Sequence, residues 1–415
     1  MNNTLIVKVI NEAHERLKGI VTKTKLERHA GLSARFGADI YLKREDLQVV
    51  RSYKLRGAYN RISLFNDDER KRGVVCASAG NHAQGVAFSC AKLGINGTIF
   101  MPKNTPRQKI ERVRTFGGNN IEIMLTGDTF DTSFAAANQF AETNGAVLVH
   151  PFDDLAVIAG QGTVAVEIFE ALPQVDVLVV PVGGGGLISG VATYAKSKNG
   201  AVKVIGVEPE GAPSMDASLK AGHAVTLDHI DTFVDGVAVK TVGENTFAIT
   251  QKVVDAIELV PEGRVCRDMI GLYQSDGIVA EPAGALSVAA LENIASDIHG
   301  KTVVCVISGG NNDISRYAEV LERSLIYQGL KHYFIVEFSQ RPGALRAFLD
   351  SALGATDDIT LFEYVKKNNR ETGPALVGIE LAKKGDLAPL LERMTGLNMT
   401  FELIRQDSPL FRFIL

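Results

Sequence analysis

The sequence predicts an α/β fold built around parallel sheets, followed by a smaller α+β domain. Short Val- and Ile-rich runs alternate with helical patterns for most of the 415 residues, which is typical of strand-helix-strand units around a sheet buried on both faces. Several of these runs end directly in Gly, Ser or Asn, and open parallel sheets bind ligands at the carboxyl ends of their strands. After about residue 327 the glycine-rich strand ends disappear, so we expect a second domain there.

Each part has its own order of expected elements. In the first part we expect strands at 73–78, 95–101, 146–152, 175–186, 202–208 and 301–311 and helices at 82–94, 105–118, 160–173 and 283–294. The last 85 residues read as strand 332–338, helix 342–354, strands 358–367 and 375–382, helix 386–397 and strand 401–406. This β-α-β-β-α-β order is the ferredoxin-like arrangement. We therefore predict domains over 1–327 and 331–415, with a smaller subdomain at roughly 55–155 in the first.

Composition excludes several classes of function. Lys and Arg number 44 against 48 Asp and Glu, without a basic tract, which argues against nucleic-acid or membrane-surface binding. No apolar run is long enough to span a bilayer, and the first 30 residues do not have the pattern of a secretion signal, so a cytoplasmic protein is expected. The four cysteines have neither C-x-x-C spacing nor nearby histidines, so no metal site is predicted, and Cys76 and Cys305 should be buried in interior strands.

A glycine-rich turn after the run VDVLVVPV is the strongest local feature. Backbone N–H groups without side chains can approach an anion closely, and the helix that follows adds positive potential, so the turn predicts a phosphate site. Its residues are Gly183, Gly184, Gly185, Gly186 and Leu187. A dinucleotide fingerprint is matched only in part, because Ser189 stands where the last glycine belongs, although Glu208 follows as a ribose-binding acid would. An NAD-type nucleotide-binding protein therefore stays open as an alternative.

Two further turns join strands to helices or loops. ASAGNHAQG, residues 77–85, could hold a carboxylate on its backbone N–H groups, and the Asn81 amide could bind a ligand oxygen or could simply cap the helix. His82 in the same turn is as compatible with packing as with acid-base work. ISGGNND, residues 307–313, places Ser308 at a strand end, where it could bond a ring nitrogen or merely close a turn.

The three turns change how Lys54, in SYKLRGAYN, is interpreted. An isolated lysine is usually solvated. Pyridoxal phosphate, however, needs a phosphate cradle, a partner for its ring nitrogen, a partner for its phenolic oxygen and a Schiff-base lysine. The sequence supplies one candidate for each, so Lys54 is predicted to be the catalytic lysine.

These motifs together resemble the threonine dehydratases of the fold-type II pyridoxal phosphate enzymes, the tryptophan synthase β-like group. The resemblance covers nearly the whole chain, because the motifs stand in family order: KREDLQ, SYKLRGAYN, ASAGNHAQGVA, MPKNTPRQKI, HPFDDLAVIAGQGT, PVGGGGLISG, FVDGVAVKTVG, EPAGA and SGGNND. The C-terminal part resembles the single ACT-like regulatory domain of the shorter biosynthetic forms.

The resemblance implies roles for individual residues. Lys54 would bind the cofactor covalently beside the aromatic Tyr53, Asn81 would bind the pyridoxal 3′ oxygen, Gly183 to Leu187 would hold the phosphate, and Ser308 would face the pyridine nitrogen. The substrate carboxylate would lie on the backbone of Ser78, Ala79, Gly80, Asn81 and His82. Related racemases carry a serine at the position of Ala79 as a second proton-transfer group, so racemisation is not expected as the main activity.

The resemblance also implies a reaction and a regulator. The reaction is the dehydration and deamination of L-threonine to 2-oxobutanoate and ammonia, the first committed step of isoleucine biosynthesis, with L-serine as a further substrate. A homotetramer and an isoleucine or valine effector at the C-terminal domain are the family expectations. A catabolic serine/threonine dehydratase is the nearest rival, and the C-terminal domain argues against it. A cation near Glu208 and the role of Glu281 are left open.

Overall fold

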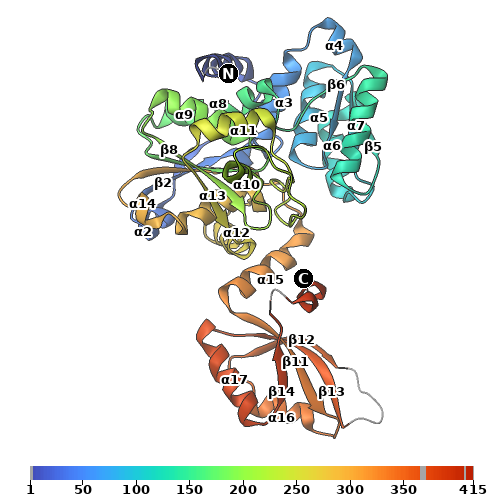
Figure 1. Cartoon of the computed structure of the whole chain (residues 1–415), viewed down its shortest axis with the longest axis vertical. Coiled ribbons are helices and arrows are strands. Elements are labelled where there is room, and N and C mark those ends of the chain that lie inside the picture. Colours follow the sequence, from blue (N-terminus) through green and yellow to red (C-terminus); the bar gives the residue numbers. More distant parts are fainter. Residues whose placement is uncertain (1–2, 365–370, 406–407, 415) are drawn as a thin grey trace. The chain divides into compact units, whose positions relative to one another are not determined.

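The computed structural model describes residues 3–364, 371–405 and 408–414 and forms two compact units, residues 1–312 and 313–415 (Figure 1). The first unit contains two sheets and the second contains one, and each unit has its own hydrophobic core. No helix in this described part of the chain is long and apolar enough to cross a membrane. The domain boundary near 327–331 and the subdomain at 55–155 stay predictions.

The first unit is built on two sheets. The larger has the strand order β1-β2-β10-β7-β8-β9, in which only the β1–β2 pair is antiparallel, and the smaller is the parallel sheet β5-β4-β3-β6. The strands are β1 (Leu26–Arg28), β2 (Asp39–Arg44), β3 (Val74–Ala77), β4 (Gly97–Met101), β5 (Ile121–Leu125), β6 (Val147–Leu148), β7 (Val177–Pro181), β8 (Lys203–Pro209), β9 (Ala256–Val260) and β10 (Thr302–Ile307).

Helices surround both sheets of this unit, and α5, α6 and α7 gather around the smaller one (Figure 1). The helices are α1 (Asn3–Leu17), α2 (Ala30–Phe36), α3 (Lys54–Ser63), α4 (Asp67–Arg72), α5 (Asn81–Leu93), α6 (Arg107–Gly117), α7 (Phe130–Asn144), α8 (Leu155–Ala171), α9 (Gly186–Lys198), α10 (Ser214–Ala221), α11 (Glu244–Val253), α12 (Glu262–Asp276), α13 (Pro282–Ala289) and α14 (Ala295–Ile298). Helix α8 is buried along most of its length, as its largely apolar sequence requires, and its buried Glu167 is paired with Arg56.

The second unit is a ferredoxin-like sheet, as predicted. Its four antiparallel strands have the order β12-β13-β11-β14. The elements are α15 (Tyr317–Gln328), β11 (Lys331–Ser339), α16 (Ala344–Ser351), β12 (Asp358–Tyr364), β13 (Thr372–Glu380), α17 (Leu387–Gly396) and β14 (Thr400–Leu403). Phe334, Phe348 and Met394 lie at the centre of its core. The expected strand ends at 365–367 and 406 lie outside the described residues.

The α/β class with parallel sheets is confirmed, and the predicted burial of the cysteines holds for Cys76 and Cys305, neither of which has exposed surface. Four strands were not predicted: β1, β2, β5 and β9. These strands carry charged or half-exposed residues and lack the continuous apolar run by which interior strands are found.

Candidate active site

Lys54 is the first residue of α3 and is partly buried. Its Nζ donates a hydrogen bond to the carbonyl oxygen of Pro151 at 2.9 Å and lies 5.5 Å from the centre of the Tyr53 ring. Burial lowers the pKa of Lys54 to about 8, and the nearby Glu281 opposes this change. A substantial fraction of Lys54 is therefore neutral near physiological pH, which a nucleophile or general base requires.

The residues before Lys54 pair with the loop that follows β10. Ser52 and Gly309 form an antiparallel bridge, and the Tyr53 N–H donates to the Ser308 carbonyl at 3.2 Å. Arg51 has a left-handed backbone with φ of 56°, and its carbonyl accepts from the Gly310 N–H at 2.9 Å. This conformation is uncommon for a residue with a side chain and turns the chain into α3. The pairing brings Lys54 and Ser308 to one place.

A buried cluster of charges fixes the first turn of α3 two residues after Lys54. The Arg56 guanidinium donates two bonds of 2.8 Å to Glu45 in the 3-10 helix η1 (Glu45–Leu47) and bonds of 2.7 and 2.9 Å to Glu167 on α8. Lys43 of β2 donates to the same Glu167 at 2.5 Å. These four side chains are at most 3% exposed. The cluster therefore joins β2, η1, α3 and α8 around the lysine.

The predicted phosphate turn lies between β7 and α9. Its N-cap residue, Gly185, has φ of 91° and no side chain, so it cannot cap the N–H groups of the first turn of α9. Phe152 packs against the turn so closely that a Cβ on Gly184 would lie 2.3 Å from its ring. Phe152 follows Pro151, the partner of Lys54, and thereby connects the turn with the lysine. Leu187 is buried in the first turn of α9.

The second predicted turn lies between β3 and α5, and Gly80 is the N-cap residue of this helix. Asn81 is therefore not the cap: its Nδ2 donates to Glu281 at 2.6 Å, and its Oδ1 accepts from Asn311 at 2.8 Å. The first-turn N–H groups of α5, like those of α9, have no capping side chain from their N-cap glycine. Ser78 and Ala79 precede Gly80 in this partly exposed turn.

His82 is buried, and its Nε2 bonds the Val149 carbonyl at 2.9 Å. Burial, followed by the charge of Lys54, lowers the pKa of His82 to about 3, so the ring is neutral. Nε2 then carries the proton, and Nδ1 is an acceptor without a hydrogen-bond partner among the described residues. His82 is thus placed beside the lysine as an acceptor and not as an acid.

Ser308 directly follows β10. Its hydroxyl is buried and donates to the Ala283 carbonyl at 3.3 Å. The hydroxyl is uncharged at any ordinary pH, and its single hydrogen can rotate from the Ala283 carbonyl to another acceptor. It can therefore donate to an unprotonated heteroaromatic nitrogen without imposing a proton on it.

The donor set of this site fits pyridoxal phosphate. Two uncapped helix starts, those of α5 and α9, present N–H groups and positive potential for a carboxylate and a phosphate. A lysine of lowered pKa, an asparagine amide and a neutral serine hydroxyl complete the groups that this cofactor needs.

Glu208 does not act as a ribose-binding acid. It has no exposed surface, and its carboxyl oxygens accept the N–H groups of Met215 and Asp216 at 2.8 and 2.9 Å. Glu208 is therefore not available to bind the ribose of a dinucleotide, which the alternative interpretation requires. In the described ranges no group of His, Cys, Asp or Glu side chains could hold a metal ion.

Two residues of the site, Phe152 and Asn311, were not predicted from the sequence, and a third, Glu281, was named with its role left open. Their positions follow from contacts between distant segments, since Asn81 and Glu281 are 200 residues apart. The only sequence signal was that each stands in or beside a stretch rich in turn residues, HPFDD, SGGNND and EPAGA.

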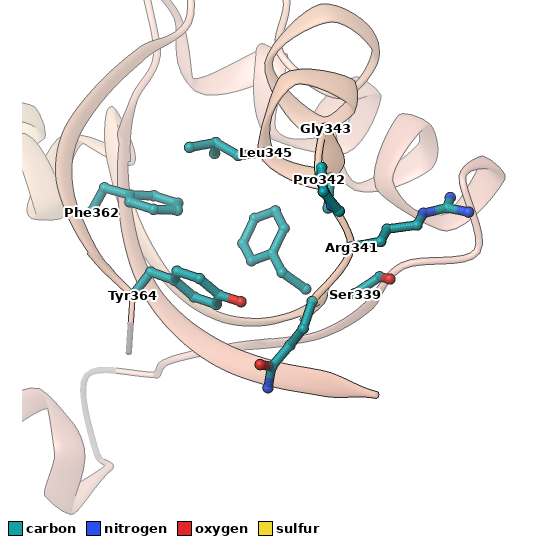
Figure 2. A pocket seen from close by; sticks show the side chains of 10 residues that line it. Ser339, Arg341, Pro342, Gly343, Leu345, Phe362 and Tyr364 are labelled. Atoms are coloured by element: carbon teal, nitrogen blue, oxygen red, sulfur yellow. The ribbon is translucent and has the colours of Figure 1, made fainter. Parts of the chain in front are cut away.

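The second unit contains a pocket of about 270 Å³ between β11, β12 and the start of α16, with largely apolar walls (Figure 2). Phe338 packs against Phe362 and Tyr364 with ring centres 5.8 and 6.2 Å apart. The side chain of Arg341 extends away from these rings (Figure 2). A pocket of this size and lining suits a small, largely apolar ligand.

Comparisons with known proteins agree with both units. Residues 17–309 match the family described as pyridoxal-phosphate dependent enzyme, and residues 322–414 match the C-terminal regulatory domain of threonine dehydratase. L-threonine dehydratase biosynthetic IlvA of Bacillus subtilis is 56% identical over 415 residues, which are 100% of this chain and 98% of that protein. The protein of the same name from Mycobacterium tuberculosis is 55% identical over 98% of this chain and 95% of its own length.

Solved structures resemble about three quarters of the chain. The processed form of threonine deaminase isoform 2 from Solanum lycopersicum has a TM-score of 0.75 and 39% identity, covering 78% of this chain and 94% of that one. Maize serine racemase has a TM-score of 0.71 and 32% identity, covering 77% and 98%.

The buried charge cluster yields a stability prediction. Replacing Arg56 with Met leaves two buried carboxylates with only Lys43 as a cation, so the free energy of unfolding should fall by about 3–5 kcal/mol. Urea denaturation of the cofactor-free protein measures this loss. Arg107→Met is the control, because Arg107 pairs with Glu111 on the surface with 91% of its side chain exposed, and such pairs contribute little. Equal losses in both variants would show that the cluster does not support the fold.

Proposed function

Because the chain belongs to the family of pyridoxal-phosphate dependent enzymes, we propose that it is a threonine dehydratase, which converts L-threonine to 2-oxobutanoate and ammonia. The observation that carries this proposal is the partly buried Lys54, with a pKa of about 8, placed beside two uncapped helix starts. Full-length identity of 56% to a biosynthetic threonine dehydratase supports the substrate. The reaction so proposed is the first committed step of isoleucine biosynthesis.

The reaction depends on the electron-withdrawing cofactor and on Lys54 as the base. When bound, pyridoxal phosphate withdraws electrons from the substrate Cα, which acidifies the Cα proton and lets the β-hydroxyl leave. Lys54 holds the cofactor before the substrate arrives and, once freed, removes the Cα proton in its neutral form. The lowered pKa of Lys54 makes that form available.

The remaining residues bind and orient. The N–H groups of the glycine turn, residues 183–187, hold the phosphate, and the backbone of residues 78–82 receives the substrate carboxylate at the start of α5. Tyr53 packs beside the lysine, and Asn81 would donate to the phenolic oxygen of the bound cofactor. Ser308 would face the ring nitrogen, and because its hydroxyl is neutral it would not hold a proton there as an aspartate would. This arrangement favours elimination over transamination.

We expect L-serine dehydration to be a secondary activity and racemisation not to be a main one. L-Serine has the same β-hydroxyl and lacks only a methyl group, which gives a modest difference in free energy, so it is a further substrate. Racemisation needs a second proton-transfer group on the opposite face, and Ala79 offers none.

The pocket of the second unit takes isoleucine as an inhibitor, with valine as its competitor. Phe338, Phe362 and Leu345 surround a branched apolar side chain, and the N–H groups at the start of α16 bind the carboxylate. The match of residues 322–414 to a regulatory domain supports this assignment.

Assembly and location follow from the same proposal. We expect a homotetramer in the cytoplasm, and the four buried free cysteines suit a reducing compartment.

Replacing Lys54 with Ala should remove the yellow colour of the purified protein and abolish 2-oxobutanoate formation from L-threonine, because the amine proposed to bind the cofactor covalently is then missing. Absorption spectra and a keto-acid assay in the same cuvette measure both properties. Lys92→Ala, an exposed lysine on α5, should behave as the parent does. Near-normal turnover in the Lys54 variant would refute the assignment.

The lowered pKa of Lys54 predicts a pH dependence in the cofactor-free protein. Only a neutral amine reacts with an acylating reagent, so the rate at Lys54 should rise as pH increases through about 8. Mass spectrometry of the Lys54 peptide at successive pH values measures this rate. The same peptide in urea-unfolded protein is the control, and its rise should lie near 10.5. Coincident curves would contradict a perturbed lysine.

Replacing Phe362 with Ala removes apolar contact area from the effector pocket, so the isoleucine concentration for half-inhibition should rise about tenfold or more. Initial rates with L-threonine at a series of isoleucine concentrations measure it. Phe413→Ala, on a ring with 89% exposure in the same unit, should leave the response unchanged. An unaltered response in the Phe362 variant would place the effector elsewhere.

A further inference from the structure

Three polar side chains form a hydrogen-bonded chain behind the proposed cofactor site. Asn311, in the loop after β10, donates through Nδ2 to Oδ1 of Asn81 at 2.8 Å. Asn81, at the start of α5, donates through its own Nδ2 to Oε1 of Glu281 at 2.6 Å. Glu281 is the N-cap residue of α13 and is 5% exposed. The chain thus connects three segments that are distant in sequence.

The direction of this chain is fixed by a backbone group. The amide of an asparagine can turn over with little change in shape, which exchanges its donor and its acceptor. Nδ2 of Asn311 also donates to the carbonyl of Val50 at 2.7 Å, and a carbonyl can only accept. Asn311 therefore presents a donor to Asn81, and Asn81 must present its donor to Glu281. If the Asn81 amide turned over, its Nδ2 and the Nδ2 of Asn311 would be two donors facing each other, whatever the protonation state of Glu281.

We propose that Glu281 and Asn311 are positioning residues that hold the Asn81 amide with its second Nδ2 hydrogen directed at the phenolic oxygen of pyridoxal phosphate. An amide nitrogen has two hydrogens, and Glu281 uses one of them. This inference rests on the proposed function, in which Asn81 binds that oxygen. It gives Glu281 a role that acts through another residue and not on the substrate.

The surroundings of Glu281 suit an orienting acceptor. A Cβ on Gly309 would lie 2.3 Å from Oε1, so only glycine leaves room for the carboxyl group there. The charged groups around Glu281 are Asp235, Lys109 and Lys54. Burial, followed by the charge of Asp235, raises the pKa of Glu281 to about 8. Its oxygen can accept from Asn81 whether the group is ionised or protonated, so the orientation holds in both states.

If Glu281 and Asn311 only stabilised the fold, any complete set of hydrogen bonds among the three side chains would be enough, whichever way the Asn81 side chain donates. The two roles separate in the double variant Asn81→Asp/Glu281→Gln. An aspartate at 81 still accepts from Asn311 and now accepts from the glutamine amide, so the chain is complete, and the carboxyl group has moved from position 281 to position 81. The variant replaces the donor for the phenolic oxygen with an acceptor.

The experiment compares the parent protein with Asn81→Asp, Glu281→Gln and the double variant. Urea unfolding of the cofactor-free proteins measures how much the hydrogen-bonded chain contributes to stability. Equilibrium dialysis measures the dissociation constant of pyridoxal phosphate. At about pH 9, where Glu281 is ionised, Asn81→Asp should lose both stability and affinity, because two carboxylates then face each other. The double variant should regain stability, yet bind the cofactor about tenfold or more weakly, as expected for one lost hydrogen bond to a charged oxygen.

Glu281→Gln is the conservative variant, because a glutamine oxygen accepts from Asn81 as well. Its affinity should stay within about threefold of the parent. Parent-like affinity in the double variant would overturn the proposal. An affinity loss in Glu281→Gln equal to that of the double variant would also overturn it, because the charge at 281 and not the direction of the Asn81 amide would then determine binding. A parent protein that does not bind pyridoxal phosphate would instead refute the proposed function.

Discussion

Arg56 imposes the constraint on which the site depends: a guanidinium without exposed surface must be shared by two buried carboxylates, Glu45 and Glu167. Removing these charges from water is unfavourable, and the interaction is favourable only when the geometry satisfies every donor and acceptor. Segments β2, η1, α3 and α8 therefore have little freedom relative to one another. Lys54 is two residues from this fixed point, so its position follows from that of Arg56.

The parallel sheets supply the second half of the arrangement. Strands β3, β7 and β10 all run into turns at their carboxyl ends, where the turns carry Asn81, the glycines and Ser308. The burial that this packing produces also lowers the pKa of Lys54, because the charged form loses its contact with water. Architecture and reactivity thus have one physical origin.

Much of this could be predicted from the sequence, because the signals are local. The apolar run before Gly183 predicts a buried strand and a close backbone turn, and the order of elements after residue 330 predicts the ferredoxin-like sheet, both of which the structure has. Strand β2 escaped prediction because Lys43 is charged and yet 1% exposed, a burial that depends on Glu167, 124 residues away. Glu281 and Asn311 escaped for the same reason, since their partners are set by tertiary contacts alone.

The separation between these partners bears on how the protein matures. Asn311 and Val50, which are hydrogen-bonded, lie 261 residues apart, and the segment at Arg51 to Tyr53 pairs with the loop at 308–310. Contacts of such long range form slowly, because a large loop must close before they contribute. On the ribosome, Lys54 emerges long before the residues that place it. A nascent chain is therefore unable to assemble this site until residue 311 has left the exit tunnel, and the cofactor can be captured only by a nearly finished catalytic unit.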